Sequence, residues 1–177
     1  MLFGCEGFEI QILELIQKIF GGQFFDFLMP QFTAVGNMGI IWILIGVVLL
    51  CIPKYRKNGV ILLLGLLIGF LLGNVLLKNL VARPRPFVFK ENAILLIKTP
   101  QDLSFPSGHT LSSFVATFAL YRTNKVFGRC ALVLAVIIAF SRMYLFVHYP
   151  TDILGGILLA CFINFICKKI EIAQIKK

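Results

Sequence analysis

Long apolar runs recur along nearly the whole chain, and they restrict its fold more than any other feature. The runs cover residues 31–52, 59–80, 104–121, 127–147 and 151–167. A hydrocarbon layer of roughly 30 Å is crossed by about 20 helical residues, so each run can cross it, although the third and fifth are near the short limit. The sequence therefore predicts an all-α, polytopic membrane helical bundle of about five transmembrane helices. We expect a single domain over residues 1–177, with the five-span bundle at 31–168.

The N-terminal segment, residues 1–30, has a different pattern. Five apolar residues recur there at helical spacing: Phe8, Ile12, Leu15, Ile16 and Ile19. Gln11, Glu14 and Lys18 lie on the opposite face of the same helix. This pattern predicts an amphipathic helix that lies in the membrane interface. A short helix that packs on the bundle fits the pattern nearly as well.

The charge of the chain fits a membrane protein better than a nucleic-acid-binding protein. The formal net charge is +9, yet the cations lie at the ends of apolar runs and not on one soluble face. We therefore expect membrane lipids, and no nucleic acid, as partners. The five cysteines form no CxxC pair, so we predict no disulfide, no metal site and no cofactor.

Three glycines, Gly65, Gly69 and Gly73, recur every fourth residue in the second apolar run. Such spacing lets a second helix approach closely. Packing within the bundle is the favoured use of this stripe, and homodimerisation is the alternative.

Three polar clusters interrupt the apolar sequence and contain both of its histidines. They cover residues 78–86 (KNLVARPRP), 106–109 (PSGH) and 141–152 (SRMYLFVHYPTD). Charged residues at membrane depth are costly and usually serve a function. Because five spans alternate sides, the three clusters meet on one face of the membrane. They lie at the end of the second span, at the start of the third, and at the junction of the fourth and fifth.

The residue types in these clusters suit a phosphate group. Lys78, Arg85 and Arg142 supply positive charge, and the arginine fork can contact two phosphate oxygens at once. In the second cluster we expect Ser104 to cap a helix and Pro106 to stand in its first turn. The N–H groups of that helix start, with the hydroxyl of Ser107 and close approach at Gly108, would bind an anion.

His148 and Asp152 are four residues apart, at the junction of the last two spans. A carboxylate beside one ring nitrogen fixes the tautomer and raises the basicity of the other nitrogen. This spacing therefore predicts that His148 is a nucleophile. A first-turn aspartate that only complements the helix dipole would leave His148 and Arg142 unexplained.

Together the clusters resemble the type 2 phosphatidic acid phosphatase superfamily, including its bacterial membrane lipid phosphatases and undecaprenyl pyrophosphate phosphatases. The signature of that family is K-x6-RP, PSGH and SR-x5-H-x3-D, and every specified position matches. The resemblance implies a metal-independent lipid phosphatase that forms a phosphohistidine on His148, with Asp152 orienting that ring. It also implies that His109 protonates the leaving oxygen and then activates water. The phosphoryl oxygens would be held by Lys78, Arg85, Ser107, Gly108 and Arg142.

The motifs leave the substrate open among undecaprenyl pyrophosphate, phosphatidylglycerol phosphate, phosphatidic acid and diacylglycerol pyrophosphate. Arg83 repeats the Arg-Pro step and is interpreted as an extra phosphate or surface contact. Two other functions are alternatives: an oxidoreductase like the vanadium haloperoxidases, which are similar in these same residues, and a non-catalytic lipid-binding or transport protein. The vanadium haloperoxidases resemble soluble helical proteins, whereas this chain is mostly apolar spans. A non-catalytic protein would suit a chain that lacks catalytic residues, and this chain has all of them.

The distribution of basic residues predicts the orientation of the chain. Ten of the 17 lysines and arginines follow or precede spans on the face opposite the motifs. Short loops rich in Lys and Arg stay in the cytoplasm. We therefore expect a multi-pass protein of the plasma membrane whose motif face, with the loop at 87–104, is extracytoplasmic.

Overall fold

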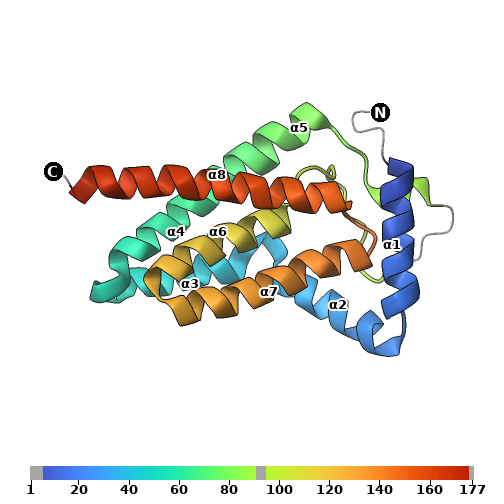
Figure 1. Ribbon diagram of the computed structural model, residues 1–177, viewed down its shortest axis with the longest axis horizontal. Coiled ribbons are helices and arrows are strands. Elements are labelled where there is room, and N and C mark those ends of the chain that lie inside the picture. The colour runs from blue at the N-terminus through green and yellow to red at the C-terminus, as the bar shows by residue number, and fades with distance from the viewer. Residues whose placement is uncertain (1–5, 91–94, 176–177) are drawn as a thin grey trace.

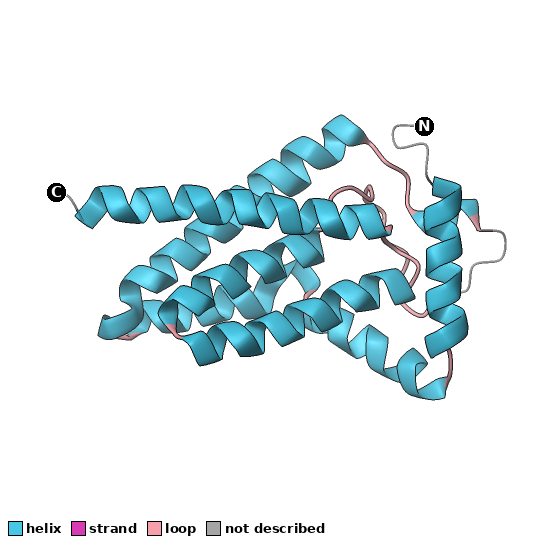
Figure 2. Cartoon of the chain, viewed as in Figure 1, coloured by secondary structure: helices cyan, strands magenta, loops and turns pink. Residues whose placement is uncertain are grey.

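The computed structural model describes residues 6–90 and 95–175, and these residues form only helices and loops (Figure 2). The long elements are α1 (Glu6–Phe20), α2 (Gln23–Val35), α3 (Ile40–Cys51), α4 (Arg56–Gly69), α6 (Gly108–Thr123), α7 (Lys125–Tyr144) and α8 (Pro150–Ile175). A π-helical stretch, η3 (Phe70–Leu77), and the short α5 (Lys78–Val81) continue α4. The described residues also form three 3₁₀ turns: η1 (Asn37–Gly39), η2 (Pro53–Tyr55) and η4 (Pro86–Phe89).

Helix α6 lies at the centre of the bundle, between α4, α7 and α8 (Figure 1). One side of its core includes Leu111 and Val115, which pack with Ile163 of α8. On another side Trp42 of α3 is buried and donates from Nε1 to Oγ of Ser113 at 3.1 Å. The helices around α6 leave large apolar side chains exposed, as expected where lipid covers a bundle; examples are Val48, Leu67, Leu158 and Phe162.

The structure confirms the all-α membrane bundle. Among the residues that the structure describes, four helical segments are long and apolar enough to cross a membrane: Gln23–Cys51, Pro53–Phe89, Lys125–Tyr144 and Pro150–Ile170. The third predicted span, at 104–121, corresponds to α6, which has 16 residues, so the number of helices that cross stays a prediction. The first span was predicted to start at residue 31, whereas α2 begins at Gln23 and contains Pro30.

Helix α1 lies across one end of the bundle, transverse to the long helices (Figure 1). Its inner face carries the buried residues Glu9 and Leu13, while Phe8 and Ile19 are more than 60% exposed. Both predicted descriptions of α1 therefore hold in part, since the helix contacts the bundle and also presents an apolar stripe. The same end of the bundle holds the start of α6, the end of α7 and the start of α8.

The stripe of Gly65, Gly69 and Gly73 is buried inside the bundle. A Cβ added at Gly73 would come within 2.4 Å of Leu111 in α6, and one at Gly65 within 3.0 Å of Val115. Close approach of α4 and η3 to α6 therefore requires small residues at Gly65 and Gly73. This packing leaves no exposed surface at the three glycines for a second copy of the chain, so the structure does not support homodimerisation through them.

Candidate active site

The three polar clusters come together at the α1 end of the bundle, as the alternation of spans predicted. They line one cavity of about 1010 Å³. Its polar wall includes six of the eight predicted site residues: Lys78, Arg85, Gly108, His109, Arg142 and His148. The other two, Ser107 and Asp152, are fully buried directly behind that wall.

The cavity carries an excess of positive charge. Among the described residues that line it, four are cations, namely Lys78, Arg85, Lys98 and Arg142, and one, Asp102, is an acid. Arg142 is buried and donates from Nη1 to Oγ1 of Thr33. Its Nε has no hydrogen-bond partner among the described residues. A buried guanidinium donor of this kind is suited to an anion that enters the cavity.

His148 is held as a neutral imidazole with its lone pair at Nε2. Nη1 of Arg85 lies 3.2 Å from Nε2, and because arginine only donates hydrogen bonds, Nε2 must accept. The proton then stands on Nδ1, which lies 3.4 Å from Oδ2 of Asp152. Burial lowers the pKa of the His148 ring, and the charges of Arg85 and Arg142 lower it further. The geometry agrees with the predicted nucleophile, which needs an unprotonated Nε2.

The start of α6 differs in detail from the prediction. Ser107, not Ser104, is the N-cap, since its Oγ accepts from the N–H of Thr110 at 3.4 Å. Pro106 therefore precedes the helix and does not stand in its first turn. Ser104 instead donates from Oγ to Oδ2 of Asp152. The hydroxyl of Ser107 serves the cap, and its predicted contact with a phosphoryl oxygen stays a prediction.

His109 lies in the first turn of α6, and its Nε2 is 2.9 Å from Oδ1 of Asn37 in η1. An amide oxygen accepts, so Nε2 carries a proton that points to Asn37. Asn37 was not among the predicted site residues. It comes from the turn between α2 and α3, and no sequence spacing connects that turn to the motifs.

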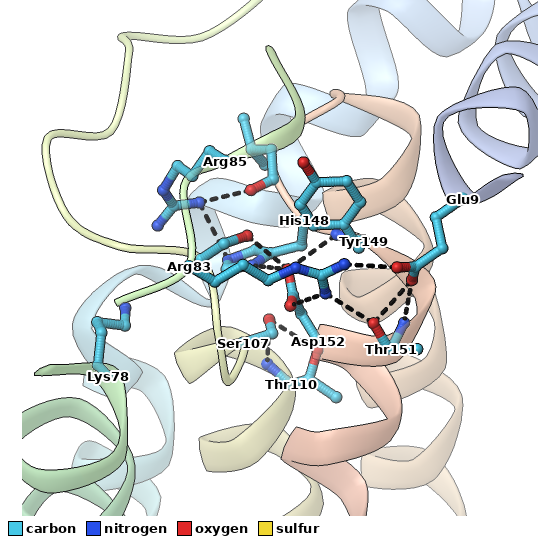
Figure 3. A network of polar contacts seen from close by, with 12 residues as sticks. Glu9, Lys78, Arg83, Arg85, Ser107, Thr110, His148, Tyr149, Thr151 and Asp152 are labelled. Carbon is cyan, nitrogen blue, oxygen red and sulfur yellow. Dashed lines mark hydrogen bonds and ion pairs between the residues drawn. The ribbon is translucent and has the colours of Figure 1, made fainter. Parts of the chain in front are cut away.

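Arg83 is neither a phosphate contact nor a surface residue, so that interpretation was wrong. It is 3% exposed and donates to the carboxylates of Glu9 and Asp152 (Figure 3). It does not line the cavity among the residues described there. Glu9 was also missed, because it belongs to neither the apolar stripe nor the polar positions that the sequence indicated for this helix.

Two non-glycine residues in the left-handed region direct the chain into the site. Ala82 (φ 48°) ends α5 just before Arg83, and Phe146 (φ 59°) precedes His148 by two residues. Such conformations cost about 1 kcal/mol or more and persist where the surrounding contacts enforce them. The turn at Ala82 lets the following residues cross the site instead of continuing the helix.

Asp102 forms ion pairs with two of the three cations that are predicted to hold phosphate. Its carboxylate accepts from Nζ of Lys78 and, at 2.6 Å, from Nη2 of Arg85. Burial raises the pKa of the Asp102 carboxyl, but the hydrogen bond from Lys78 and the charge of Arg85 outweigh it and hold the pKa well below its usual range. The side chain is 55% exposed, so an incoming anion can displace it.

We therefore predict that Asp102→Asn binds inorganic phosphate more tightly. Charged hydrogen bonds are worth about 1.5–3 kcal/mol, and the exposure of Asp102 to water favours the lower end, so the expected gain is about tenfold. Titration calorimetry of the detergent-solubilised protein measures it. Glu14→Gln, which removes an exposed carboxylate at the same end of the molecule, is the control. Weaker phosphate binding by Asp102→Asn would mean that the carboxylate organises the cations and does not compete with phosphate.

Comparisons with known proteins agree with the arrangement of this site. A family model described as the PAP2 superfamily matches residues 58–175, which include all three clusters. The chain is 36% identical over 132 residues to an undecaprenyl-diphosphatase of Sulfolobus acidocaldarius, covering 74% of this chain and 64% of that one. It is 33% identical over 93 residues to undecaprenyl-diphosphatase BcrC of Bacillus subtilis, covering 52% of this chain and 48% of that one. The matches thus span less than two thirds of either relative.

The fold is also similar to a solved structure. A transmembrane PAP2 type phosphatidylglycerolphosphate phosphatase from Bacillus subtilis superposes with a TM-score of 0.78 and 25% sequence identity. The superposition covers 96% of this chain and 87% of that one. The likeness therefore extends beyond the three motifs to the helices around them, α1 and α2 included.

Proposed function

Since the chain belongs to the PAP2 superfamily, the type 2 phosphatidic acid phosphatases, we propose that it is a membrane phosphatase that removes phosphate from a lipid phosphate or pyrophosphate. The observation that carries this proposal is the cavity, which joins a cationic wall to an apolar one. The apolar wall includes Ile43, Leu63, Leu67 and Phe70. A phosphate group at the first wall and a hydrocarbon chain along the second would satisfy both.

The length of the apolar wall favours a lipid over a small soluble phosphate. Lys78 and Leu63 lie on the same continuous helical segment, 15 residues apart. At a rise of 1.5 Å per residue the cavity follows that segment for roughly 20 Å. Several isoprene units or an acyl chain would fit along it. The names of the two relatives favour a polyprenyl pyrophosphate, so we take undecaprenyl pyrophosphate as the first candidate.

In the proposed reaction Nε2 of His148 attacks phosphorus and the bond from phosphorus to the leaving oxygen breaks. His109 gives a proton to that oxygen, and Asp152 holds the proton on Nδ1 of His148. Water, deprotonated by His109, then attacks the phosphohistidine, which releases inorganic phosphate and restores the free imidazole. Lys78, Arg85, Arg142 and the N–H groups at the start of α6 would neutralise the phosphoryl oxygens, which is the work that metal ions do in other phosphatases.

The test is phosphate release by purified, detergent-solubilised protein. The substrates are undecaprenyl pyrophosphate, phosphatidylglycerol phosphate, phosphatidic acid, diacylglycerol pyrophosphate and, as the soluble control, glucose 6-phosphate. We expect release from a lipid substrate, none from the sugar phosphate, and no effect of EDTA. Loss of activity in EDTA that a divalent ion restores would refute the metal-independent mechanism. If no phosphate is released from any of these lipids, the proposed phosphatase function is refuted.

We also propose that the cavity faces the extracytoplasmic side of the plasma membrane. The turns at the opposite end of the bundle carry Lys54, Arg56, Arg122 and Lys125 (Figure 1). In a variant without native cysteines, Val88→Cys on the motif side should react with a membrane-impermeant thiol reagent in intact cells. Lys57→Cys, at the basic end, should react only after lysis. The reverse pattern would overturn the orientation.

A further inference from the structure

An ion network lies behind the catalytic pair, on the side of Asp152 that faces away from His148 (Figure 3). Nη1 of Arg83 donates to Oδ1 of Asp152 at 2.8 Å, and Nη2 donates to Oε2 of Glu9. Glu9 and Arg83 are each only 3% exposed. The guanidinium thus lies between two carboxylates, one from α1 and one from the first turn of α8.

Thr151 closes this network into a ring. Its N–H donates to Oε1 of Glu9 at 2.9 Å, and its hydroxyl donates to the same oxygen at 2.7 Å. Nη1 of Arg83 in turn donates to the Thr151 hydroxyl oxygen at 2.7 Å. The guanidinium also stacks 3.8 Å from the ring centre of Tyr149. These contacts hold the plane of Arg83 and the carboxylate of Glu9 in one arrangement.

The two oxygens of Asp152 have separate tasks. Oδ1 accepts from Arg83, while Oδ2 accepts from the N–H of Tyr149 at 2.9 Å, from Ser104, and faces Nδ1 of His148. A buried cation is strongly attracted to any carboxylate beside it. Without Glu9, Arg83 would lose one of these two carboxylates, and its pull on Asp152 would increase in competition with His148. With Glu9, the charge of Arg83 is shared between two carboxylates.

We propose that Glu9 is a positioning residue for phosphoryl transfer: by sharing the charge of Arg83, it leaves Asp152 to orient His148 and to stabilise its positive charge as the phosphohistidine forms. This inference rests on the proposed function, in which His148 is the nucleophile. Neither Glu9 nor Arg83 lines the cavity, so both act through Asp152 and not on the substrate. The amphipathic helix α1 thereby becomes part of the catalytic apparatus.

The test compares Glu9→Gln with Glu14→Gln in the full-length protein. Both changes remove one carboxylate from α1, but Glu14 is 52% exposed and lies 3.9 Å from Lys90, away from the ring. For Glu9→Gln we expect kcat to fall about 10-fold to 100-fold, the loss usual when groups that orient a functional histidine are removed. KM and the inhibition constant of inorganic phosphate should not change, and Glu14→Gln should match the wild type in all three.

A rescue experiment separates charge sharing from simple structural support. In Glu9→Gln/Arg83→Gln both charges are absent, so Asp152 again serves His148 and kcat should rise above that of Glu9→Gln. A double variant that is no more active than the single one would overturn the proposal. So would wild-type kcat in Glu9→Gln, or a parallel loss of phosphate inhibition.

Two further controls complete the design. If Glu9→Gln does not give a monodisperse protein on gel filtration, Glu9→Asp, which keeps the charge, takes its place. Its kcat, KM and inhibition constant for phosphate are then compared with those of the double variant. Rapid-quench detection of acid-labile phosphoenzyme in the wild type tests the proposed function separately. Its absence would refute the nucleophile His148. Its presence, with unchanged formation in Glu9→Gln, would refute only the role of Glu9.

Discussion

Replacement of His148 by alanine is expected to abolish turnover and the phosphoenzyme together. The proposed reaction has no other nucleophile, since His109 bonds to Asn37 and has no described carboxylate partner. Loss of a covalent nucleophile lowers kcat by about 10⁴-fold or more. The measurement is phosphate release from the lipid substrate, with rapid-quench detection of acid-labile phosphate on the protein.

The control for this variant is its affinity for inorganic phosphate. The imidazole of His148 is buried and neutral, and its removal leaves the cations of the cavity in place. His148→Ala should therefore still bind phosphate, which would show that the site is folded. Activity close to that of the wild type, in a variant that binds phosphate, would contradict the phosphohistidine mechanism.

The sequence predicted the fold and most of the site because both depend on local signals. Apolar runs of span length specify helices in lipid, and the strict alternation of sides then brings three distant clusters to one face. The close spacing of His148 and Asp152 predicted a contact, and the structure has it at 3.4 Å, although His148 lies in the bend before α8 and not on the helix. These parts of the site needed no knowledge of how the helices pack.

The missed residues depend on tertiary contacts that leave no periodic signal. Asp102 reaches Lys78 and Arg85 from a loop of irregular conformation. Glu9 reaches Arg83 across 74 residues. It belongs to neither the apolar nor the polar face that the sequence predicted for its helix, and it shares the buried face with Leu13, four residues on.

Arg83 shows why a charge near a phosphate motif is not by itself a phosphate ligand. In a regular extended segment, side chains two residues apart point to the same side, but Arg83 and Arg85 do not. Arg85 faces the cavity, and Arg83 faces Glu9 and Asp152. The irregular backbone after Ala82 thus places one arginine at the predicted phosphate site and the other beside Asp152.

Replacement of His109 by alanine is expected to lower kcat severely, and the loss should depend on the leaving group. General acid catalysis contributes about 10²-fold to 10⁴-fold, and it matters most when a basic alkoxide or phosphate must leave. With p-nitrophenyl phosphate, whose leaving group needs no proton, His109→Ala should form the phosphoenzyme at a rate closer to that of the wild type.

The second role of His109 is to activate water, and its loss in His109→Ala should make the phosphoenzyme accumulate. Without a base to activate water, hydrolysis of the phosphohistidine becomes the slow step, so one equivalent of p-nitrophenol should appear in a burst and stop. Asn37→Ala, which removes the partner of His109 but keeps its ring, is the matched variant and should lose less activity with the lipid substrate. An equal loss with both substrates, and no burst, would mean that His109 shapes the site without transferring a proton.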